Sequence, residues 1–199
     1  MKPINNFGKA KEAASYTGSA QLPAGAYVCK ILGVKYETFD WGDQIKLQID
    51  IEEGEQKDFF KKQYESNTAE DKKWKGIAKV TVPKDEDEEW KHTAFARWPV
   101  AIEESNKGYV WDWDENKWKG KLIGIVFGPT GTVIDGKEVV FTEAHGPASV
   151  EAVKSGRFYK KLLELKKTKG YTGTQSSTEP AGDNDFMKIP DNASETIPF

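Results

Sequence analysis

Residues 45–51 read Ile-Lys-Leu-Gln-Ile-Asp-Ile and alternate strictly between apolar and polar side chains. Successive side chains of a β-strand point to opposite faces of a sheet, so this alternation predicts a strand with one buried face. The four branched aliphatic residues would lie in the core, and the polar residues between them would face outward.

Two further strands are predicted on either side of this one along the chain. Residues 26–36 (AYVCKILGVKY) form the first, with Gly33 as a bulge where the strand bends, and residues 77–82 (IAKVTV) form the third, ended by Pro83. The spacing of the apolar residues then changes. Within 85–106 they recur at helical spacing, and acidic residues lie at the N-terminal end of this predicted helix. We expect Pro99 to kink or restart this helix and Asn106-Lys107-Gly108 to end it.

The second half of the chain adds two strands. Residues 122–127 (LIGIVF) are a short apolar run, and residues 138–141 return after a tight turn at Asp135-Gly136. Three strands, a helix and two strands predict a mainly β protein and fit an OB-fold, a five-stranded Greek-key barrel with a helix between strands three and four. Other small barrels have the same order. The expected domains are an N-terminal arm (1–22), the OB-fold (23–169), closed by a basic helix within 149–169, and a flexible acidic tail (170–199).

The composition narrows the class of protein. The chain has 199 residues, a net charge of −3, one cysteine and two histidines. These are too few thiols and imidazoles for a structural zinc site, and one cysteine agrees with a reducing compartment. No apolar run is long enough to cross a bilayer and the start lacks a secretory h-region, so we expect a cytoplasmic protein with no membrane association.

Charge is distributed unevenly along the chain. Residues 176–199 contain one basic and five acidic residues, a net charge of −4, which leaves +1 in the rest of the chain. Residues 154–169 hold seven basic residues against Glu164 alone. A basic segment followed by an acidic tail is typical of proteins that handle a polyanion, although basic stretches are also commonly just solvated.

Motifs of common enzymes are missing from the sequence. It has no phosphate-binding loop of the GxxxxGK[ST] type, no GxSxG nucleophile elbow and no HExxH. The carboxylates of Asp112, Asp114 and Glu115 could hold a magnesium ion as in a nuclease, but a polar loop explains them more simply. We therefore expect no catalytic residues, no metal and no cofactor.

Aromatic residues interleaved with lysines are the strongest signal in the body of the chain. A ring can stack on an unpaired base while a neighbouring ammonium group neutralises phosphate. On this basis the predicted nucleic-acid-binding residues are Lys35, Tyr36, Phe39, Trp41, Lys72, Lys73, Trp74, Lys75, Trp113, Trp118, Lys119 and Lys121. We expect the remaining large rings to pack in the core, namely Phe59, Phe60, Trp90, Phe95, Trp98 and Trp111.

The last residues, GDNDFMKIPDNASETIPF, end in Ile197-Pro198-Phe199 after dispersed acidic residues. This ending resembles the C-terminal tip of bacterial and phage single-stranded DNA-binding proteins (the SSB family). It differs in having Glu195-Thr196 where that family has a denser aspartate run. The resemblance implies that the tip docks on partner proteins through Asp185, Asp191, Glu195, Ile197, Pro198 and Phe199.

The segment KGYVWDWDENKWKGKLIGIVFG (107–128) is similar to proteins of phage replication and recombination regions. Together the two resemblances imply a phage-type single-stranded DNA-binding protein, acting without strong sequence preference in the cytoplasm of a bacterial host. Its partners would be single-stranded DNA and host or phage replication and repair proteins, and self-association is compatible with the sequence. Two alternatives are a protein-interaction adaptor of a replication or recombination complex and a metal-dependent nuclease.

Overall fold

The structure is a computed structural model of the chain and describes residues 21–173. It is mainly β. The long strands are β1 (Gly25–Phe39), β2 (Gly42–Ile51), β3 (Ile77–Val82), β4 (Leu122–Ile134) and β5 (Lys137–Ala148). The helices are α2 (Phe59–Ser66), α3 (Glu89–Ser105) and α4 (Val150–Lys154), with 3-10 turns η1 (Glu115–Trp118) and η2 (Lys160–Leu163). A short strand β6 (Lys166–Lys167) follows.

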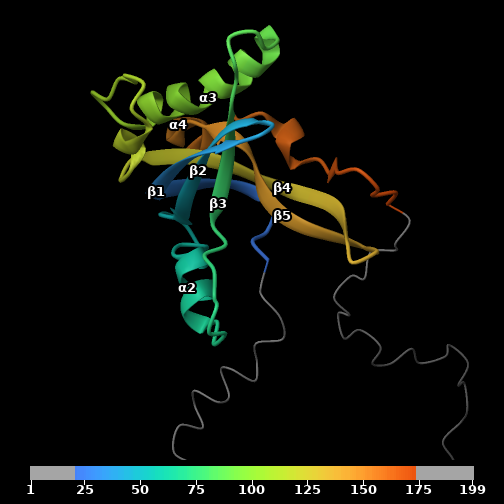
Figure 1. Cartoon of the computed structure of the whole chain (residues 1–199). Coiled ribbons are helices and arrows are strands. Elements are labelled where there is room, and N and C mark those ends of the chain that lie inside the picture. The colour runs from blue at the N-terminus through green and yellow to red at the C-terminus, as the bar shows by residue number, and fades with distance from the viewer. Residues whose placement is uncertain (1–20, 174–199) are drawn as a thin grey trace, which may run out of the picture.

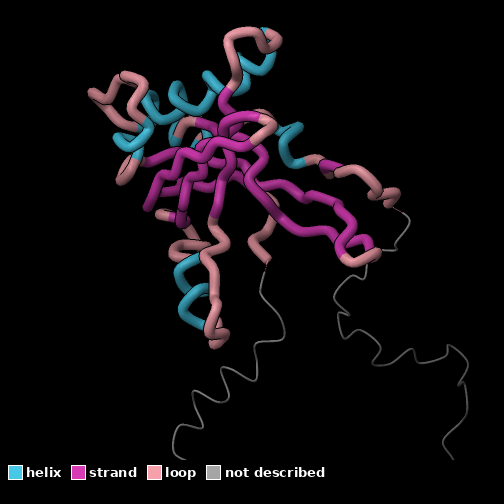
Figure 2. Tube along the Cα trace, viewed as in Figure 1, coloured by secondary structure: helices cyan, strands magenta, loops and turns pink. Residues whose placement is uncertain are grey.

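All the strands belong to one sheet (Figure 2). The order across the sheet is β3-β2-β1-β4-β5, every neighbouring pair in it is antiparallel, and β6 pairs parallel to β4. The Cα atoms of β3 and β5 come within 8 Å of each other although no ladder is assigned between these two edge strands. The sheet therefore curls towards itself but stays open along the β3–β5 boundary.

The core lies between one face of the sheet and the helices that pack on it. Ile45, Leu47, Ile49 and Ile51 are all buried, as predicted, and Lys46 and Gln48 between them are only partly buried. Asp50 is the exception, because it is buried although the alternation predicts that it faces outward. The four aliphatic residues pack with residues of β1, β3 and β4. The helix α3 crosses one side of the sheet and adds Phe95, Trp98 and Ile102 to the core (Figure 1). α2 extends from the opposite side, and the β4–β5 hairpin projects beyond the other strands (Figure 1).

The predicted order of three strands, a helix and two strands agrees with the structure, but several elements are longer. β1, β4 and β5 run further than the predicted strands, and the register shift between Ile31 and Gly33 confirms the bulge. Asp135 and Gly136 both have positive φ, as a two-residue hairpin turn requires. α3 continues through Pro99 as one helix and ends at Ser105.

Two segments differ from the sequence prediction. The basic helix expected within 149–169 is confirmed only at its start: α4 begins after Ser149 and is five residues long, and η2 and β6 follow it. α2 was not predicted at all. The folded part also includes Leu22, which is buried in the core, and Tyr171, whose ring lies against Gly131. The sequence boundaries at residues 23 and 169 left both outside the domain.

Candidate nucleic-acid interface

The β1–β2 hairpin carries an ordered stack of a cation and two rings. Phe39 ends β1 and Trp41 lies in the two-residue turn; their rings are stacked with centroids 5.0 Å apart and an interplanar angle of 7°. Lys46 Nζ lies 5.3 Å from the centroid of Phe39. Trp41 is 61% exposed. The hairpin therefore presents an indole to solvent that Phe39 already holds in place.

A row of three lysines runs across the outer face of β1, β2 and β3. Lys35 is paired with Lys46 in the β1–β2 register, and Lys46 is paired with Lys79 in the β2–β3 register. Directly paired residues of antiparallel strands have side chains on the same face with Cβ atoms about 5 Å apart. We call these three residues the lysine row. Like charges opposite one another destabilise a sheet, so this arrangement favours an anionic ligand.

Glu37 neutralises part of the lysine row. Its carboxylate pairs with Lys35 at 2.8 Å and also with Lys46. Hydrogen bonds from these two ammonium groups hold the pKa of Glu37 below its usual range. Lys79 makes no ion pair with any of the described residues, so one carboxylate faces three cations and the row keeps a net positive charge.

A second cluster of a cation and two rings, which are tilted rather than stacked, lies just before β3. Lys72 Nζ is 4.6 Å from the centroid of Tyr64 in α2, and the rings of Tyr64 and Trp74 are 5.8 Å apart. Trp74 is half-buried, and its Nε1 donates to Ile49 O at 3.0 Å and to Gly76 O at 3.2 Å. These bonds give Trp74 a structural role, but part of its ring is still accessible.

The segment between α3 and β4 holds three tryptophans in different environments. Trp113 is 79% exposed, whereas Trp118 is completely buried with its ring 4.8 Å from that of Trp111. The stacking role predicted for Trp118 is therefore wrong, because a ring in the core offers no face to a base. Lys121 Nζ lies 4.7 Å above the ring of Tyr109, and Lys119 is exposed.

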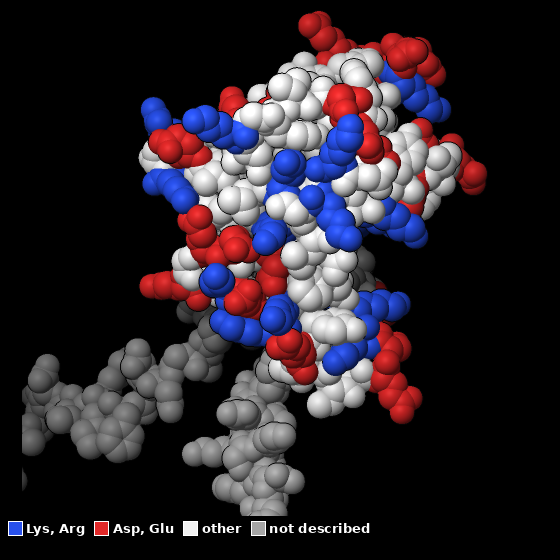
Figure 3. All heavy atoms as spheres, turned by 90° about the vertical axis from the view of Figure 1, so that its left-hand side faces the viewer, with Lys and Arg blue, Asp and Glu red and all other residues white. Residues whose placement is uncertain are grey.

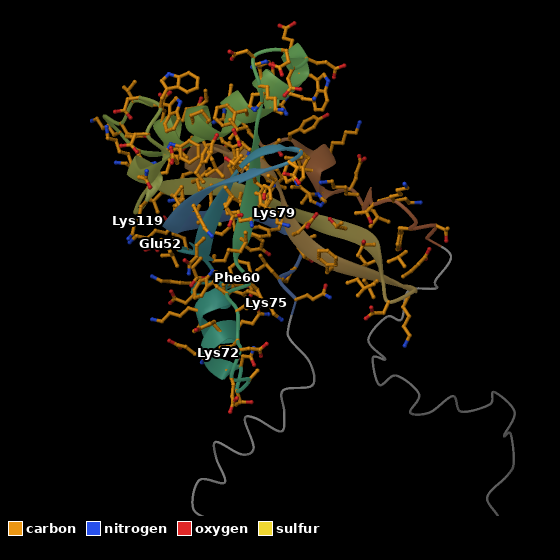
Figure 4. All side chains as sticks on the ribbon, in the orientation of Figure 1. Glu52, Phe60, Lys72, Lys75, Lys79 and Lys119 are labelled. Carbon is orange, nitrogen blue, oxygen red and sulfur yellow. The ribbon has the colours of Figure 1, made fainter. Side chains whose placement is uncertain are left out.

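The predicted residues do not form one surface. Lys35, Phe39 and Trp41 lie together on the hairpin, beside Lys46 and Lys79. Lys72 and Lys75 follow the approach to β3, below Lys79 in Figure 4, whereas Lys119 lies apart from all three (Figure 4). Lys73 is exposed in the same approach.

Tyr36 lies on the other face of β1, since it is paired with core residue Ile45. Its hydroxyl donates to Asp43 at 2.7 Å, and this bond raises the pKa of Tyr36 to about 12. The charge of Glu115 also acts on Tyr36, which places η1 near this part of the hairpin.

Basic side chains are also concentrated on one part of the molecular surface. Seen from the left-hand side of Figure 1, Lys and Arg side chains gather in the middle of the molecule, and acidic side chains lie above and below them (Figure 3). This face would attract a polyanion at its centre rather than over its whole extent.

Sequence reasoning missed Lys46, Tyr64 and Lys79. Lys46 and Lys79 occupy outward positions of predicted strands, so alternation alone could have found them. Their alignment with Lys35 depends on strand register, which the sequence does not show. Among the rings expected in the core, Phe60, Phe95 and Trp98 are buried, and Phe59 and Trp111 pack against the core. Trp90 is 64% exposed, so the core position predicted for it is wrong.

The acidic residues after α3 are engaged by a lysine. Lys117 pairs with Asp112 and lies 3.9 Å from Asp114. Within residues 21–173, no group of three or more His, Cys, Asp or Glu side chains is arranged to hold a metal ion. No helix in this range has both the length and the apolar character needed to span a bilayer. The predicted tip residues, Asp185 to Phe199, lie outside the described residues.

Comparison with known proteins gives no family. No protein-family model matches the chain, and no curated protein matches it significantly.

Proposed function

We propose that this protein binds single-stranded DNA without strong sequence preference, as a non-enzymatic protein of phage DNA replication, recombination or repair. One observation carries the proposal: an exposed, pre-stacked Trp41 lies beside the lysine row on the outer face of β1–β3. Stacking on Trp41 would hold an unpaired base, and Lys35, Lys46 and Lys79 would neutralise the phosphates beside it.

An OB-fold is the finer description of the sheet that we propose with this function. The strand order β3-β2-β1-β4-β5, the helix between β3 and β4, and the approach of β3 to β5 support it. In OB-folds the outer face of strands two and three and the loop between strands one and two bind oligonucleotides. Trp41 lies in this loop, and Lys46 and Lys79 lie on this face.

Pre-organisation explains why the stack suits a non-specific ligand. Phe39 restricts the motion of Trp41 before binding, so less side-chain entropy is lost when a base stacks on it. A base of any type has a face that can stack, and the lysines contact only the backbone. The site therefore has no element that selects one base over another.

The acidic tail extends the proposal to partner proteins. The resemblance of Ile197-Pro198-Phe199 to the SSB tip supports docking of replication or repair proteins in the bacterial cytoplasm. The alternative of a protein-interaction adaptor is favoured by one observation only: Val133, Ile134 and Val140 are exposed on the projecting β4–β5 hairpin.

Trp41→Ala in the full-length protein tests the DNA-binding proposal. Affinity for fluorescent oligo(dT), measured by anisotropy, should fall by about 1–3 kcal/mol because one stacking surface is removed. Trp90→Ala is the matched control, since Trp90 is equally exposed but lies on α3. Equal affinities of wild-type protein and the Trp41 variant, or no binding of oligo(dT) at low salt, would show that the hairpin is not a DNA site.

Duplex DNA and single-stranded RNA of the same length complete this experiment. The proposal expects duplex DNA to bind much more weakly, because its bases are already stacked on one another and are not available to Trp41.

A further inference from the structure

A groove of about 320 Å³ lies along the open boundary between β3 and β5. Its volume is at the lower end of the range of small-molecule sites. Its lining includes Phe59, Phe60, Phe127 and Phe141, with Lys75 and Lys79 at the rim. Figure 4 shows Phe60 at the start of α2, with Lys75 just before β3 and Lys79 within it.

Aromatic rings form the apolar part of this groove. The ring centroids of Phe60 and Phe127 are 6.0 Å apart, and that of Phe59 is 5.3 Å from Phe60. Gly76 is needed for this packing, because a Cβ there would lie 2.6 Å from Phe60 Cδ2 and collide with Ile49 O. The apolar wall is therefore fixed by the fold rather than assembled by a ligand.

Backbone polar groups of β3 and β5 lie along the two edges of the groove. Gln21 Nε2 donates to Val140 O at 3.4 Å, so this carbonyl points away from β4. Backbone groups alternate in direction along a strand, which directs the N–H and C=O of Thr142 to the same side. On β3, Gly76 O accepts from Ile49 N in β2, so by the same alternation the backbone groups of Lys79 point away from β2.

Charge distinguishes the occupants that such a groove could take. Lys75 and Lys79 are both exposed at its rim, and Glu143 is the one acidic residue among the described residues that line it, so the lysines outnumber the carboxylate. Lys79 is also the last member of the lysine row. An anionic chain that follows Lys35, Lys46 and Lys79 across the sheet therefore arrives at the groove. An apolar peptide would gain nothing from this continuity.

We propose that the groove binds one base of the same DNA strand, turned in between β3 and β5, while Lys75 and Lys79 hold the phosphates on either side of it. This inference rests on the proposed function and extends the DNA path from the β1–β2 hairpin to α2. The base would contact the half-buried rings of Phe59 and Phe141, and its polar edge would meet the backbone groups of Lys79 and Thr142.

Photocrosslinking of the full-length protein to an oligonucleotide containing 5-iodouracil tests the path, with crosslinked residues identified by mass spectrometry. The inference expects crosslinks in two places, at Phe39 or Trp41 in the hairpin and at Phe59 or Phe141 in the groove. Crosslinks in the hairpin alone would overturn it and leave the proposed function intact. Absence of crosslinks at both places would overturn both.

Two variants connect the second set of crosslinks with the groove. Ala144→Leu adds bulk at a lining residue, and it should remove the groove crosslinks and weaken oligonucleotide binding about tenfold while hairpin crosslinks persist. Lys75→Ala changes an exposed side chain and should lower the yield of groove crosslinks even if Ala144→Leu fails to fold. Unchanged groove crosslinks in Lys75→Ala and in folded Ala144→Leu would overturn the inference. If another segment of this chain fills the groove, no crosslinks will form there, and this result would also overturn the inference.

Discussion

Asp50 connects β2 with α2 through its buried carboxylate. Oδ1 accepts from Ile51 N at 2.9 Å and from Phe60 N at 3.0 Å, and Oδ2 accepts from Lys61 N at 3.2 Å. Phe60 and Lys61 are in the first turn of α2, where N–H groups have no partner within the helix. Asp58, the residue before the helix, makes no side-chain cap bond, so Asp50 supplies the cap from another strand.

Asp50→Ala should lower the free energy of unfolding by about 1–3 kcal/mol, because buried N–H groups lose their acceptor. Asp50→Asn keeps one oxygen and should lose much less. Burial raises the pKa of Asp50 despite the three N–H donors, so its contribution to stability is greatest below the ordinary aspartate pKa and falls as pH rises through the raised value. Urea unfolding followed by tryptophan fluorescence measures both variants. An alanine variant as stable as wild type would exclude the capping role.

Tyr36 and Asp43 form a titrating pair on the β1–β2 hairpin. The hydrogen bond from Tyr36 lowers the pKa of Asp43 and raises that of Tyr36 to about 12. The Asp43 contribution to stability is therefore present above the ordinary aspartate pKa and is lost as pH falls through the lowered value. The Tyr36 contribution is present below the ordinary tyrosine pKa and is lost as pH rises towards 12.

Tyr36→Phe should raise the pKa of Asp43 towards its ordinary value, measured from carboxyl carbon shifts by NMR. The ultraviolet titration of wild-type protein should contain one tyrosine with an apparent pKa near 12 that the variant lacks. Thr38→Val is a useful comparison, because Thr38 also lowers the pKa of Asp43 by a hydrogen bond. An unchanged Asp43 titration in Tyr36→Phe would mean that this bond does not persist in solution.

At the scale of secondary-structure elements, the lysine row is a property of three strands together. Each member contributes one charge, and binding to phosphates releases the counterions that neutralise it. Lys79→Ala should therefore reduce the slope of log affinity against log salt by about 0.7 for single strands. Titrations of oligo(dT) at several salt concentrations provide this slope.

Lys107→Ala is the matched control for the salt experiment, since Lys107 is exposed just after α3 and away from the row. A slope reduced equally by both substitutions would indicate diffuse attraction to the whole protein rather than phosphate contacts along β1–β3. Loss of affinity at Lys79 without a change of slope would point to a role in folding.

In residues 154–169, tertiary contacts override the local preference for a helix. The basic residues of 154–169 have no strong helix breaker after Gly156, yet α4 ends before that glycine, which has φ +68°. The chain then takes partners on the sheet: His145 Nδ1 bonds Leu162 O at 2.7 Å, and β6 pairs with the part of β4 that β1 leaves free. Satisfying this exposed edge of β4 competes with continuing the helix.

At the scale of the whole molecule, we propose that two activities lie in separate parts of the chain. The described body, residues 21–173, carries the candidate DNA interface, and the tail carries the sequence that resembles a partner-docking tip. A long polar linker between them, rich in Gly, Ser and Thr, would let both act at once.

Deleting Phe199 should abolish recovery of replication or repair proteins in pull-downs from bacterial lysate and leave oligo(dT) affinity unchanged. The reason is that an aromatic ring at a peptide end can fill an apolar pocket, while Pro198 limits the entropy lost on docking. Ser194→Ala is the control within the same segment. Recovery of the same partners with and without Phe199 would show that the resemblance to the SSB tip has no functional meaning.

The sequence by itself determined the features that depend on neighbouring residues. The alternation at 45–51 specified a strand with one buried face, Asp135-Gly136 specified a tight turn, and helical spacing specified α3. It also singled out Phe39 and Trp41, because these rings share a turn-like segment with Lys35 at the end of the first predicted strand. These signals are local, so no knowledge of distant segments was needed.

Only the tertiary structure decided which of these residues work together. Strand register aligned Lys35 with Lys46 and Lys79, burial removed Trp118 from the candidate site, and the curl of the sheet created the groove between β3 and β5. Each depends on hydrogen bonds or packing between segments far apart in the chain. A shift of one residue in register would turn an outward lysine into the core, and local sequence cannot specify that choice because the partner strand determines it.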